Sequence, residues 1–512
     1  MFQQTPARKS AGLFAVCWAS LLVLLLVRND ALFTKVIYEP GDYAANSILT
    51  YQAKHFAVLT GHYSRIGFFH PGPAFIYVQA AGEWLLHDVT GIAAAPFDGQ
   101  VIAIMALNAA LIALTLMIVY SWLGSVPAVL GAAGVTLAFL AEHTRPLVSN
   151  TWMPFVCFAP FLLYLFAVAS VASGRFRHLW IMVFAGSLLV HGHAEFLFLV
   201  PLLALVALVP QRRQLLTHRR DVVVASGVLA VFLLPIVLNE ILHWPGEIPK
   251  YLTYGARKAN WPPDAVRYLM QYWGPGLALG TVVLVVLFAV DFVLVRALAT
   301  RVGGDPHAFS RNLLRIVAVA TALFLVYCWY GVDDLKAPYI GMFSYALPLA
   351  LLILGASALV MLLSTIRKGV WAHWLRVGVA GLSVAVGLAL AATSPAVLNF
   401  PEDVGGMPAA LNYLFAQAHG RPIVLETRTD PSWIYLLGTL LAATRDGQRA
   451  CLAQEHWRHV VPAEFMCTKQ ELAGGARFVI SQVAPFPRAV PVVWSSSPYP
   501  ELYNTAVIIP VN

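Results

Sequence analysis

Long apolar stretches recur along the chain and alternate with short polar segments. A helix needs about 20 residues to cross the roughly 30 Å hydrocarbon core of a bilayer. By this measure we predict eleven membrane-spanning helices, near residues 12–28, 99–123, 126–141, 153–173, 178–192, 194–210, 221–240, 274–296, 313–331, 342–364 and 375–396. The pattern is that of a polytopic α-helical membrane protein.

Basic residues indicate how these helices are oriented, because short cytoplasmic loops are enriched in Lys and Arg. Arg8 and Lys9 precede the first predicted span. Each later basic loop follows an even number of crossings: Arg175 and Arg177, Arg212 to Arg220, Arg296 to Arg315, and Arg367 to Arg376. The N-terminus is therefore expected in the cytoplasm. After the eleventh span, the C-terminal segment is expected outside it.

Composition supports the same class. Of the 512 residues, 59% are hydrophobic and 11% are charged, whereas an ordinary soluble domain is about 25% charged. This excludes a soluble enzyme, a disordered chain and a coiled coil as descriptions of the whole protein. The net charge is +8, and the Arg and Lys residues cluster in short loops between apolar stretches. We therefore expect the lipid bilayer, and no nucleic acid, as a partner.

The first external loop, residues 29–98, contains a fairly apolar stretch at residues 70–86. This stretch includes Pro71, Pro73 and Glu83, and counting it as a crossing would invert every later basic loop. We therefore predict a juxtamembrane helix that lies on the outer face.

A second juxtamembrane helix is predicted over residues 42–60, which alternate as an amphipathic helix does. In this interpretation Ala45, Ile48 and Leu49 face lipid, while Asn46 and Gln52 face water.

The C-terminal segment is expected to form a small α/β domain. Residues 422–426, 477–482 and 506–511 are typical of strands, and 432–445 of a helix. The predicted organisation is a transmembrane module over residues 1–396 and an extracytoplasmic domain over 397–512.

Two of the five cysteines, Cys451 and Cys467, lie in this polar segment. A disulfide between them would close a loop of about 15 residues and contribute roughly 3 kcal/mol. Such a bond requires an oxidising compartment, which agrees with the orientation inferred from the basic loops.

Polar residues that could support chemistry gather in the predicted external loops. Glu39 and Asp42 follow the first span and flank a Pro-Gly turn. A carboxylate at the boundary between water and lipid is placed to deprotonate a hydroxyl group. The alternative is an ordinary turn in which the aspartate caps the next helix.

Two further external segments carry candidate phosphate ligands. Arg65 and His70 lie just before and at the start of the predicted helix over residues 70–86, and Lys336 lies between the ninth and tenth spans. A lysine binds phosphate as a point charge. The alternatives are a structural turn at His70 and a hydrated loop at Lys336.

The loop from residue 239 to 273 mixes aromatic and charged residues, among them Trp244, Arg257 and Lys258. Such a mixture suits contacts with sugar and phosphate, and equally suits an interfacial aromatic belt. Trp152, before the fourth span, adds another external aromatic side chain.

A weak metal candidate is the sequence His191-Gly192-His193-Ala194-Glu195 at an outer turn. Zinc takes three or four such ligands. The alternative is a polar turn where two helices meet, and no metal is required by the sequence.

Three of these segments resemble the GT-C class of integral-membrane glycosyltransferases. Glu39-Pro-Gly-Asp42-Tyr43-Ala-Ala is similar to the acidic segment that carries the class's catalytic carboxylate. Phe69-His70-Pro-Gly-Pro looks like the His-Pro turn of many bacterial members. Lys336 to Tyr339, followed by Phe343-Ser-Tyr345-Ala-Leu-Pro, looks like the phosphate-side loop and its following helix.

The resemblance implies a cell-envelope enzyme of the bacterial plasma (inner) membrane that uses a polyprenyl-phosphate-linked hexose or pentose as donor. Asp42, with Glu39 nearby, would be the catalytic carboxylate, and inversion at the sugar is expected. Lys336, Arg65, His70, Arg257 and Lys258 would contact the donor phosphate, and Tyr43, Trp152, Trp244 and Tyr345 the sugar or acceptor. The acceptor would be a glycan, lipid or protein. No cofactor is required, although a divalent cation is compatible with the site.

Three other functions stay open. A sensor or assembly protein that binds through its C-terminal segment predicts no need for Asp42, Lys336 or His70. A transporter or flippase of lipid-linked glycans predicts polar residues inside the bundle and internal symmetry, whereas the predicted spans contain Asn108, Asp291 and few other polar residues. A ligase of lipid-linked glycans would share the outward site and use a diphosphate-linked chain.

Overall fold

The computed structural model describes residues 7–143, 146–255, 259–366, 370–393, 406–428, 432–481, 490–492 and 506–511. The chain divides into two compact units. The first unit joins Met1–Leu25 to Met105–Val397, and the second joins Leu26–Ile104 to Leu398–Asn512. The first external loop thus belongs with the C-terminal segment, a grouping that the sequence did not predict.

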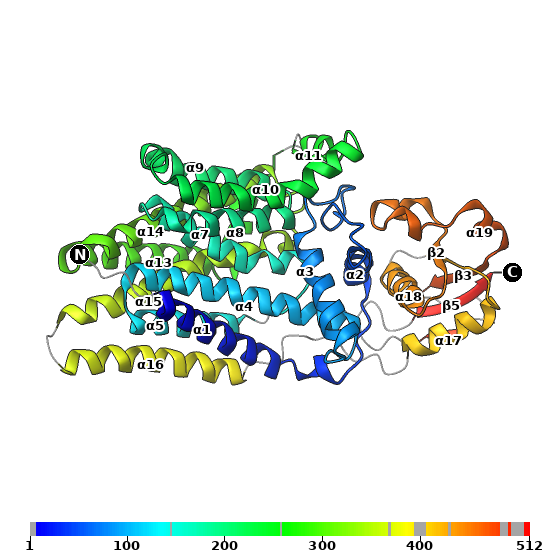
Figure 1. The fold of residues 1–512 in the computed structure, drawn as a ribbon, viewed down its shortest axis with the longest axis horizontal. Coiled ribbons are helices and arrows are strands. Elements are labelled where there is room, and N and C mark those ends of the chain that lie inside the picture. The colour runs from blue at the N-terminus through cyan, green and yellow to red at the C-terminus, as the bar shows by residue number, and fades with distance from the viewer. Residues whose placement is uncertain are drawn as a thin grey trace. The chain divides into compact units, whose positions relative to one another are not determined.

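The first unit is a helical bundle, in which α1 is dark blue and the other helices run from cyan through green to yellow in Figure 1. Its principal helices coincide with the predicted spans: α1 (Ala7–Val27), α5 (Val126–Glu142), α6 and α7 (Met153–Val156 and Phe158–Ala172), α8 (Leu179–Gly192), α9 (Phe196–Leu215), α10 (Arg219–Leu242), α13 (Gly276–Arg301), α14 (Gly304–Tyr330), α15 (Ala346–Ile366) and α16 (Val370–Thr393). Shorter helices α11 (Ile248–Gly255) and α12 (Pro262–Met270) lie in the loop after α10. Helix α4 (Pro96–Leu123) belongs partly to each unit.

Among the described residues, nine helical segments are long and apolar enough to cross a membrane. Helices α5 and α8, with 17 and 14 residues, are shorter. The membrane-protein class is confirmed, and the number of crossings stays a prediction.

Helix α7 lies in the interior of the bundle. Every residue from Phe158 to Val171 is buried, whereas α10 and α13 leave most of their apolar side chains exposed. A helix that is apolar on all sides is typical of such an interior position. Exposed apolar faces on α10 and α13 suit contact with lipid.

Helices α5 and α16 pack closely through small residues. A Cβ atom added to Gly134 would lie 2.4 Å from the Ser383 side chain, and one added to Gly387 would lie 2.5 Å from the Gly134 carbonyl oxygen. Small residues let transmembrane helices approach each other in this way.

The second unit contains α2 (Gly41–Ala53), α3 (Ala74–Gly82) and a π-helical turn (Glu83–Val89) from the first external loop. Its C-terminal part contains α17 (Gly406–Ala418), α18 (Trp433–Arg445) and α19 (Lys469–Gly474) with strands β1 (Ile423–Thr427), β2 (Ala450–Leu452), β3 (Ala476–Ser481), β4 (Val490–Val492) and β5 (Ala506–Val511). The predicted α/β character of this segment is confirmed.

The five strands form one sheet in the order β2-β1-β3-β5-β4. Strand β1 pairs in parallel with both β2 and β3, and Ile423 lies opposite Ala450 on one side and Ala476 on the other. Strand β5 pairs antiparallel with β3 and β4. The sequence did not predict β2 and β4, because three residues are too few to show an alternating pattern.

The prediction that α2 turns an apolar face to lipid is wrong. Ala45 and Ile48 belong to one buried cluster with Leu436 and Leu440 of α18. The opposite face is covered as well, since Asn46 and Gln52 are buried. Amphipathic spacing alone does not distinguish a helix that rests on a membrane from one that packs against a domain.

Cys451 and Cys467 form a disulfide. Cys451 lies on β2, and the Cys467 N–H donates to the Leu452 carbonyl oxygen at 3.0 Å. The bond therefore holds the segment after β2 against the edge of the sheet. Cys17, Cys157 and Cys328 are free thiols.

Replacing both Cys451 and Cys467 by serine is expected to destabilise the second unit by about 3 kcal/mol, because the unfolded chain loses a cross-link that closes a short loop. Thermal unfolding of the purified protein, with limited proteolysis as the probe of the second unit, measures this change as a shift of the unfolding midpoint. Cys17→Ser is the control and should leave the midpoint unchanged. Equal midpoints for the double variant and the control would contradict the prediction.

Candidate active site

Asp42 lies in the first turn of α2. The turn before it begins with Pro40 in an extended conformation and continues with Gly41 at φ +52, which glycine adopts at little cost. Asp42 is half-buried, and its Oδ1 accepts a hydrogen bond from the Tyr63 hydroxyl. The positive end of the helix dipole favours a carboxylate at this position.

Tyr63 comes from a hairpin over residues 61–70. It pairs with Phe69 in an antiparallel bridge, and the His70 N–H donates to the His62 carbonyl oxygen at 2.8 Å. His70 is 4% exposed and lies edge-on to Phe68, so the candidate phosphate ligand is buried here. Arg65, at the tip of the hairpin, is exposed.

Tyr43, the neighbour of Asp42, is half-buried, and its ring meets Phe97 edge-on with 5.8 Å between centroids. Its ring is thus held by packing within the same unit.

Glu39 is buried beside Arg445, the last residue of α18. The Nη1 atom of Arg445 lies 2.7 Å from Glu39 Oε1 and 3.0 Å from Oε2. Its Nη2 atom donates to Glu83 Oε2 at 3.1 Å. One guanidinium thus bridges two buried carboxylates, since Glu39 is 2% and Glu83 0% exposed.

Glu83 is also the partner of Lys54 and Gln100. Lys54 Nζ lies 2.7 Å from Glu83 Oε1 and 2.9 Å from Asp88 Oδ2. Gln100 donates to Glu83 Oε2 at 2.8 Å. Asp88 is exposed. We call Glu39, Arg445, Glu83 and Lys54 the buried ion cluster.

The cations of this cluster are charged. Burial disfavours the charged guanidinium, but the attraction of Glu39 and Glu83 outweighs it and raises the pKa of Arg445. Burial also disfavours the charged ammonium of Lys54, but the attraction of Glu83 and Asp88 outweighs this effect and raises the pKa of Lys54. Opposite charges at these distances favour the ionised forms.

Helix α18 also touches the turn before Asp42 through its backbone. A Cβ added to Gly438 would lie 2.7 Å from the Glu39 carbonyl oxygen, and one added to Gly41 would lie 3.2 Å from the Trp433 ring. The turn from Glu39 to Gly41 is therefore packed against α18 at both ends.

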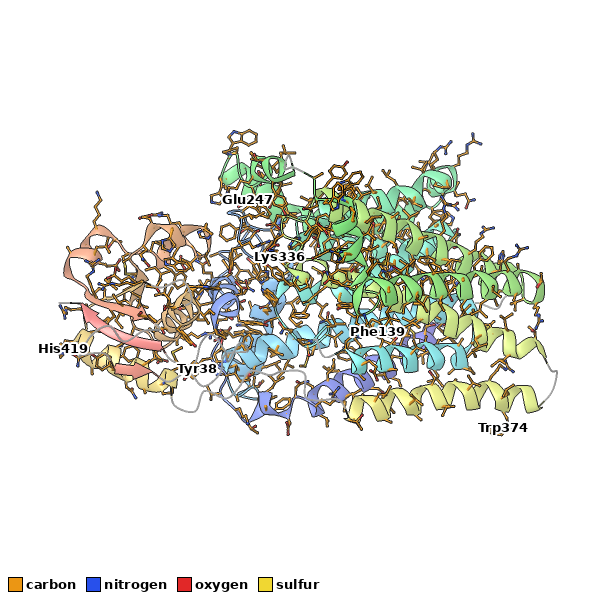
Figure 2. All side chains as sticks on the ribbon, turned by 180° about the vertical axis from the view of Figure 1, so that it is seen from behind. Tyr38, Phe139, Glu247, Lys336, Trp374 and His419 are labelled. Carbon is orange, nitrogen blue, oxygen red and sulfur yellow. A yellow bond between two sulfur atoms is a disulfide. The ribbon has the colours of Figure 1, made fainter. Side chains whose placement is uncertain are left out.

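The remaining candidates that the structure describes lie in the first unit. Lys336 is exposed in the loop after α14, and its backbone N–H donates to Asp334 Oδ1 at 2.9 Å (Figure 2). The 3₁₀ helix Pro338–Tyr345 follows. The centroid of its Tyr339 ring lies 5.0 Å from that of Trp152, and the centroid of the Tyr345 ring lies 5.2 Å from that of Tyr272. Trp152 thus packs against the 3₁₀ helix that follows the Lys336 loop, and Tyr345 is the last residue of that helix.

Trp244 is 83% exposed after α10, while Arg257 and Lys258 lie outside the described residues. His191 faces the Phe232 carbonyl oxygen at 2.8 Å, and His193 lies 3.2 Å from Glu195. Within the described part of the chain, no group of three or more metal-binding side chains was found. His191 and the His193–Glu195 pair are therefore engaged separately.

Glu39, Asp42, Tyr43, Arg65 and His70 all lie in the second unit. Lys336, Trp152 and Tyr345 belong to the first. Sequence reasoning missed Tyr63 and Arg445 as partners of the two acidic residues. Glu83 was noticed as an acid in an apolar stretch, and a buried acid needs a cation. Nothing in the sequence identifies Arg445 as that cation.

No protein-family model and no curated protein sequence matches the chain. Two solved structures of ArnT from Cupriavidus metallidurans match over 98% of both chains. The apo structure is 12% identical with a TM-score of 0.58, and the structure bound to undecaprenyl phosphate is 15% identical with a TM-score of 0.56. The arabinofuranosyltransferase AftD from Mycobacteria matches 83% of this chain and 30% of its own, at 16% identity and a TM-score of 0.43. The GT-C fold that the resemblance implied is confirmed by the match to ArnT, a glycosyltransferase of that class.

Gly438→Ala is expected to destabilise the second unit by about 1–3 kcal/mol, because its Cβ would overlap the Glu39 carbonyl oxygen and overpacking forces backbone shifts. Thermal unfolding measures the loss. Gly474→Ala is the matched control, since nothing lies within 4 Å of the added atom. A Gly438→Ala midpoint equal to that of the control would show that α18 does not press on this turn.

Proposed function

We propose that this chain is an inverting glycosyltransferase that moves a sugar from a polyprenyl-phosphate donor to an extracytoplasmic acceptor at the bacterial plasma membrane. The observation that carries the proposal is the fold shared with ArnT over nearly the whole of both chains, in one case with undecaprenyl phosphate bound to ArnT. The exposed apolar helices supply the membrane setting that such a donor needs.

Asp42 is the general base in this proposal. Its carboxylate takes the proton of an acceptor hydroxyl as that oxygen attacks the anomeric carbon. The bond between this carbon and the phosphate oxygen breaks, and the lipid phosphate leaves with the electron pair. A single displacement of this kind inverts the configuration. A positioned base contributes about 10²–10⁴ in rate.

Glu39 is the weaker candidate for the base. Both of its oxygens accept hydrogen bonds from Arg445, and the side chain is buried. Asp42 is half-buried and begins a helix, which suits a carboxylate that must reach a substrate. We therefore assign Glu39 a structural role.

Lys336 is the proposed contact for the donor phosphate. It is exposed, and the structure gives its ammonium no ion pair among the described residues. The leaving phosphate monoester is anionic, so cationic groups stabilise it as the bond breaks. A divalent cation is not required, because side chains can neutralise one phosphate.

Asp42→Asn should abolish most turnover while the protein stays folded, because the amide cannot accept the proton. The test is mass spectrometry of lipids from a deletion strain that expresses wild type or the variant. A polyprenyl-phosphate monosaccharide should accumulate with Asp42→Asn and fall with wild type. The exposed Asp30→Asn, in the same loop, is the control.

Other lipid outcomes decide between functions. Accumulation of a diphosphate-linked oligosaccharide would favour a ligase or flippase. Lipids that are identical in the wild-type and Asp42→Asn strains, at equal expression, would overturn the proposed reaction.

Lys336→Ala is expected to weaken undecaprenyl phosphate binding about tenfold, which corresponds to roughly 1.4 kcal/mol for one lost charge contact. Quenching of tryptophan fluorescence by titrated undecaprenyl phosphate measures the affinity. Lys250→Ala is the control, because Lys250 is already paired with Glu247 at 2.7 Å. Equal affinities for the Lys336→Ala variant and wild type would remove Lys336 from the site.

A further inference from the structure

Arg445 lies far from Asp42 in sequence but is joined to the same short turn. Its guanidinium reaches Glu39 and Glu83 with separate nitrogen atoms, at 2.7 and 3.1 Å. Only a planar fork with several donors can hold two carboxylates in this way. The contact therefore fixes a geometry as well as balancing charge.

Two residues of the buried ion cluster flank α2, one at each end of the helix. Glu39 precedes α2 by two residues, and Lys54 follows its last residue directly. Both are tied to Glu83, the first through Arg445 and the second by its own ion pair. The cluster thus anchors both ends of the helix whose first turn carries Asp42.

Backbone contacts strengthen the anchor at the start of α2. Gly438 and Arg445 are seven residues apart on α18, so they lie on the same face of that helix, two turns apart. Gly438 meets the Glu39 backbone oxygen while Arg445 holds the Glu39 side chain. Pro40 then limits the freedom of the link to Asp42.

We propose that Arg445 is a positioning residue, which fixes the start of α2 and the Asp42 carboxylate by holding Glu39 and Glu83 together. The proposal rests on the proposed function in assigning Asp42 as the base. It gives the C-terminal segment a part in the reaction itself, through a side chain that touches neither substrate nor reacting atoms.

Arg445→Lys tests the proposal, because lysine keeps the charge but cannot reach both carboxylates with a rigid fork. Hydrogen exchange of the full-length protein in nanodiscs should quicken at least tenfold at residues 41–46, with β1 and β3 within twofold of wild type. In the deletion strain, the lipid that accumulates with Asp42→Asn should accumulate here too. Arg449→Lys is the control, since Arg449 pairs with Glu471 at an exposed site in the same segment.

A double variant separates geometry from the cost of a buried carboxylate that has lost its partner. In Arg445→Lys with Glu39→Gln, position 39 is neutral, and the introduced lysine and Lys54 both face Glu83. No buried carboxylate then lacks a cation, so the unfolding midpoint should recover. Exchange at residues 41–46 should stay fast and the lipid should still accumulate, because the start of α2 is untied. If the double variant restored exchange and turnover together, the positioning role would be wrong.

The remaining outcomes are equally decisive. Exchange that rises evenly through the second unit in Arg445→Lys would make Arg445 a general stabiliser and overturn the proposal. The proposal would also be overturned if Arg445→Lys left hydrogen exchange at residues 41–46 unchanged and gave the same lipids as wild type. If Asp42→Asn leaves the lipids unchanged while exchange at residues 41–46 still quickens in Arg445→Lys, the proposed reaction fails, whereas the anchoring of α2 by Arg445 stands.

Discussion

Two carboxylates and one guanidinium, all withdrawn from water, impose the strictest constraint on the second unit. Charges in a low-dielectric interior are tolerated when they are paired and hydrogen-bonded, and removing one partner of a buried pair typically costs 3–5 kcal/mol. Arg445 satisfies Glu39 and Glu83 together, while Lys54 and Gln100 complete the shell of Glu83. The approach of α18 to the first external loop follows from this need, as does the glycine at position 438.

The helices of the membrane bundle are held together by a different interaction. Lipid is as apolar as the side chains, so burial of apolar surface does not drive the helices together, and close packing must do so. Helix α7 is buried from Phe158 to Val171, and glycines bring α5 and α16 into contact. The two units thus reach stability by different physical means within one chain.

The sequence predicted the features that depend on local pattern. The positions of the apolar helices and three of the five strands were found because each leaves a continuous signature in neighbouring residues. The number of crossings and the orientation inferred from the basic loops stay predictions. The GT-C fold was found from short motifs around Asp42, His70 and Lys336, and the likeness to ArnT confirms it. The roles assigned to those residues stay predictions.

Features that depend on distant partners were not predicted. The apolar face of α2 was assigned to lipid because periodicity does not reveal what covers a helix, and α18 covers it. Arg445 was overlooked because one arginine at a helix end is ordinary until its carboxylate partners are known. Strands β2 and β4 are defined by their neighbours in the sheet, since three residues carry no pattern of their own.

The discontinuous make-up of the second unit has a consequence for biosynthesis. Glu39 and Arg445 are 406 residues apart, and chains are synthesised at about 5–20 residues per second. Some 20 to 80 seconds therefore pass between the emergence of the acidic turn and that of its cation. During this interval the first external loop has two carboxylates without their guanidinium, so it must wait in a hydrated, unfinished state. A segment that is synthesised late thus completes the fold of one that was synthesised long before it.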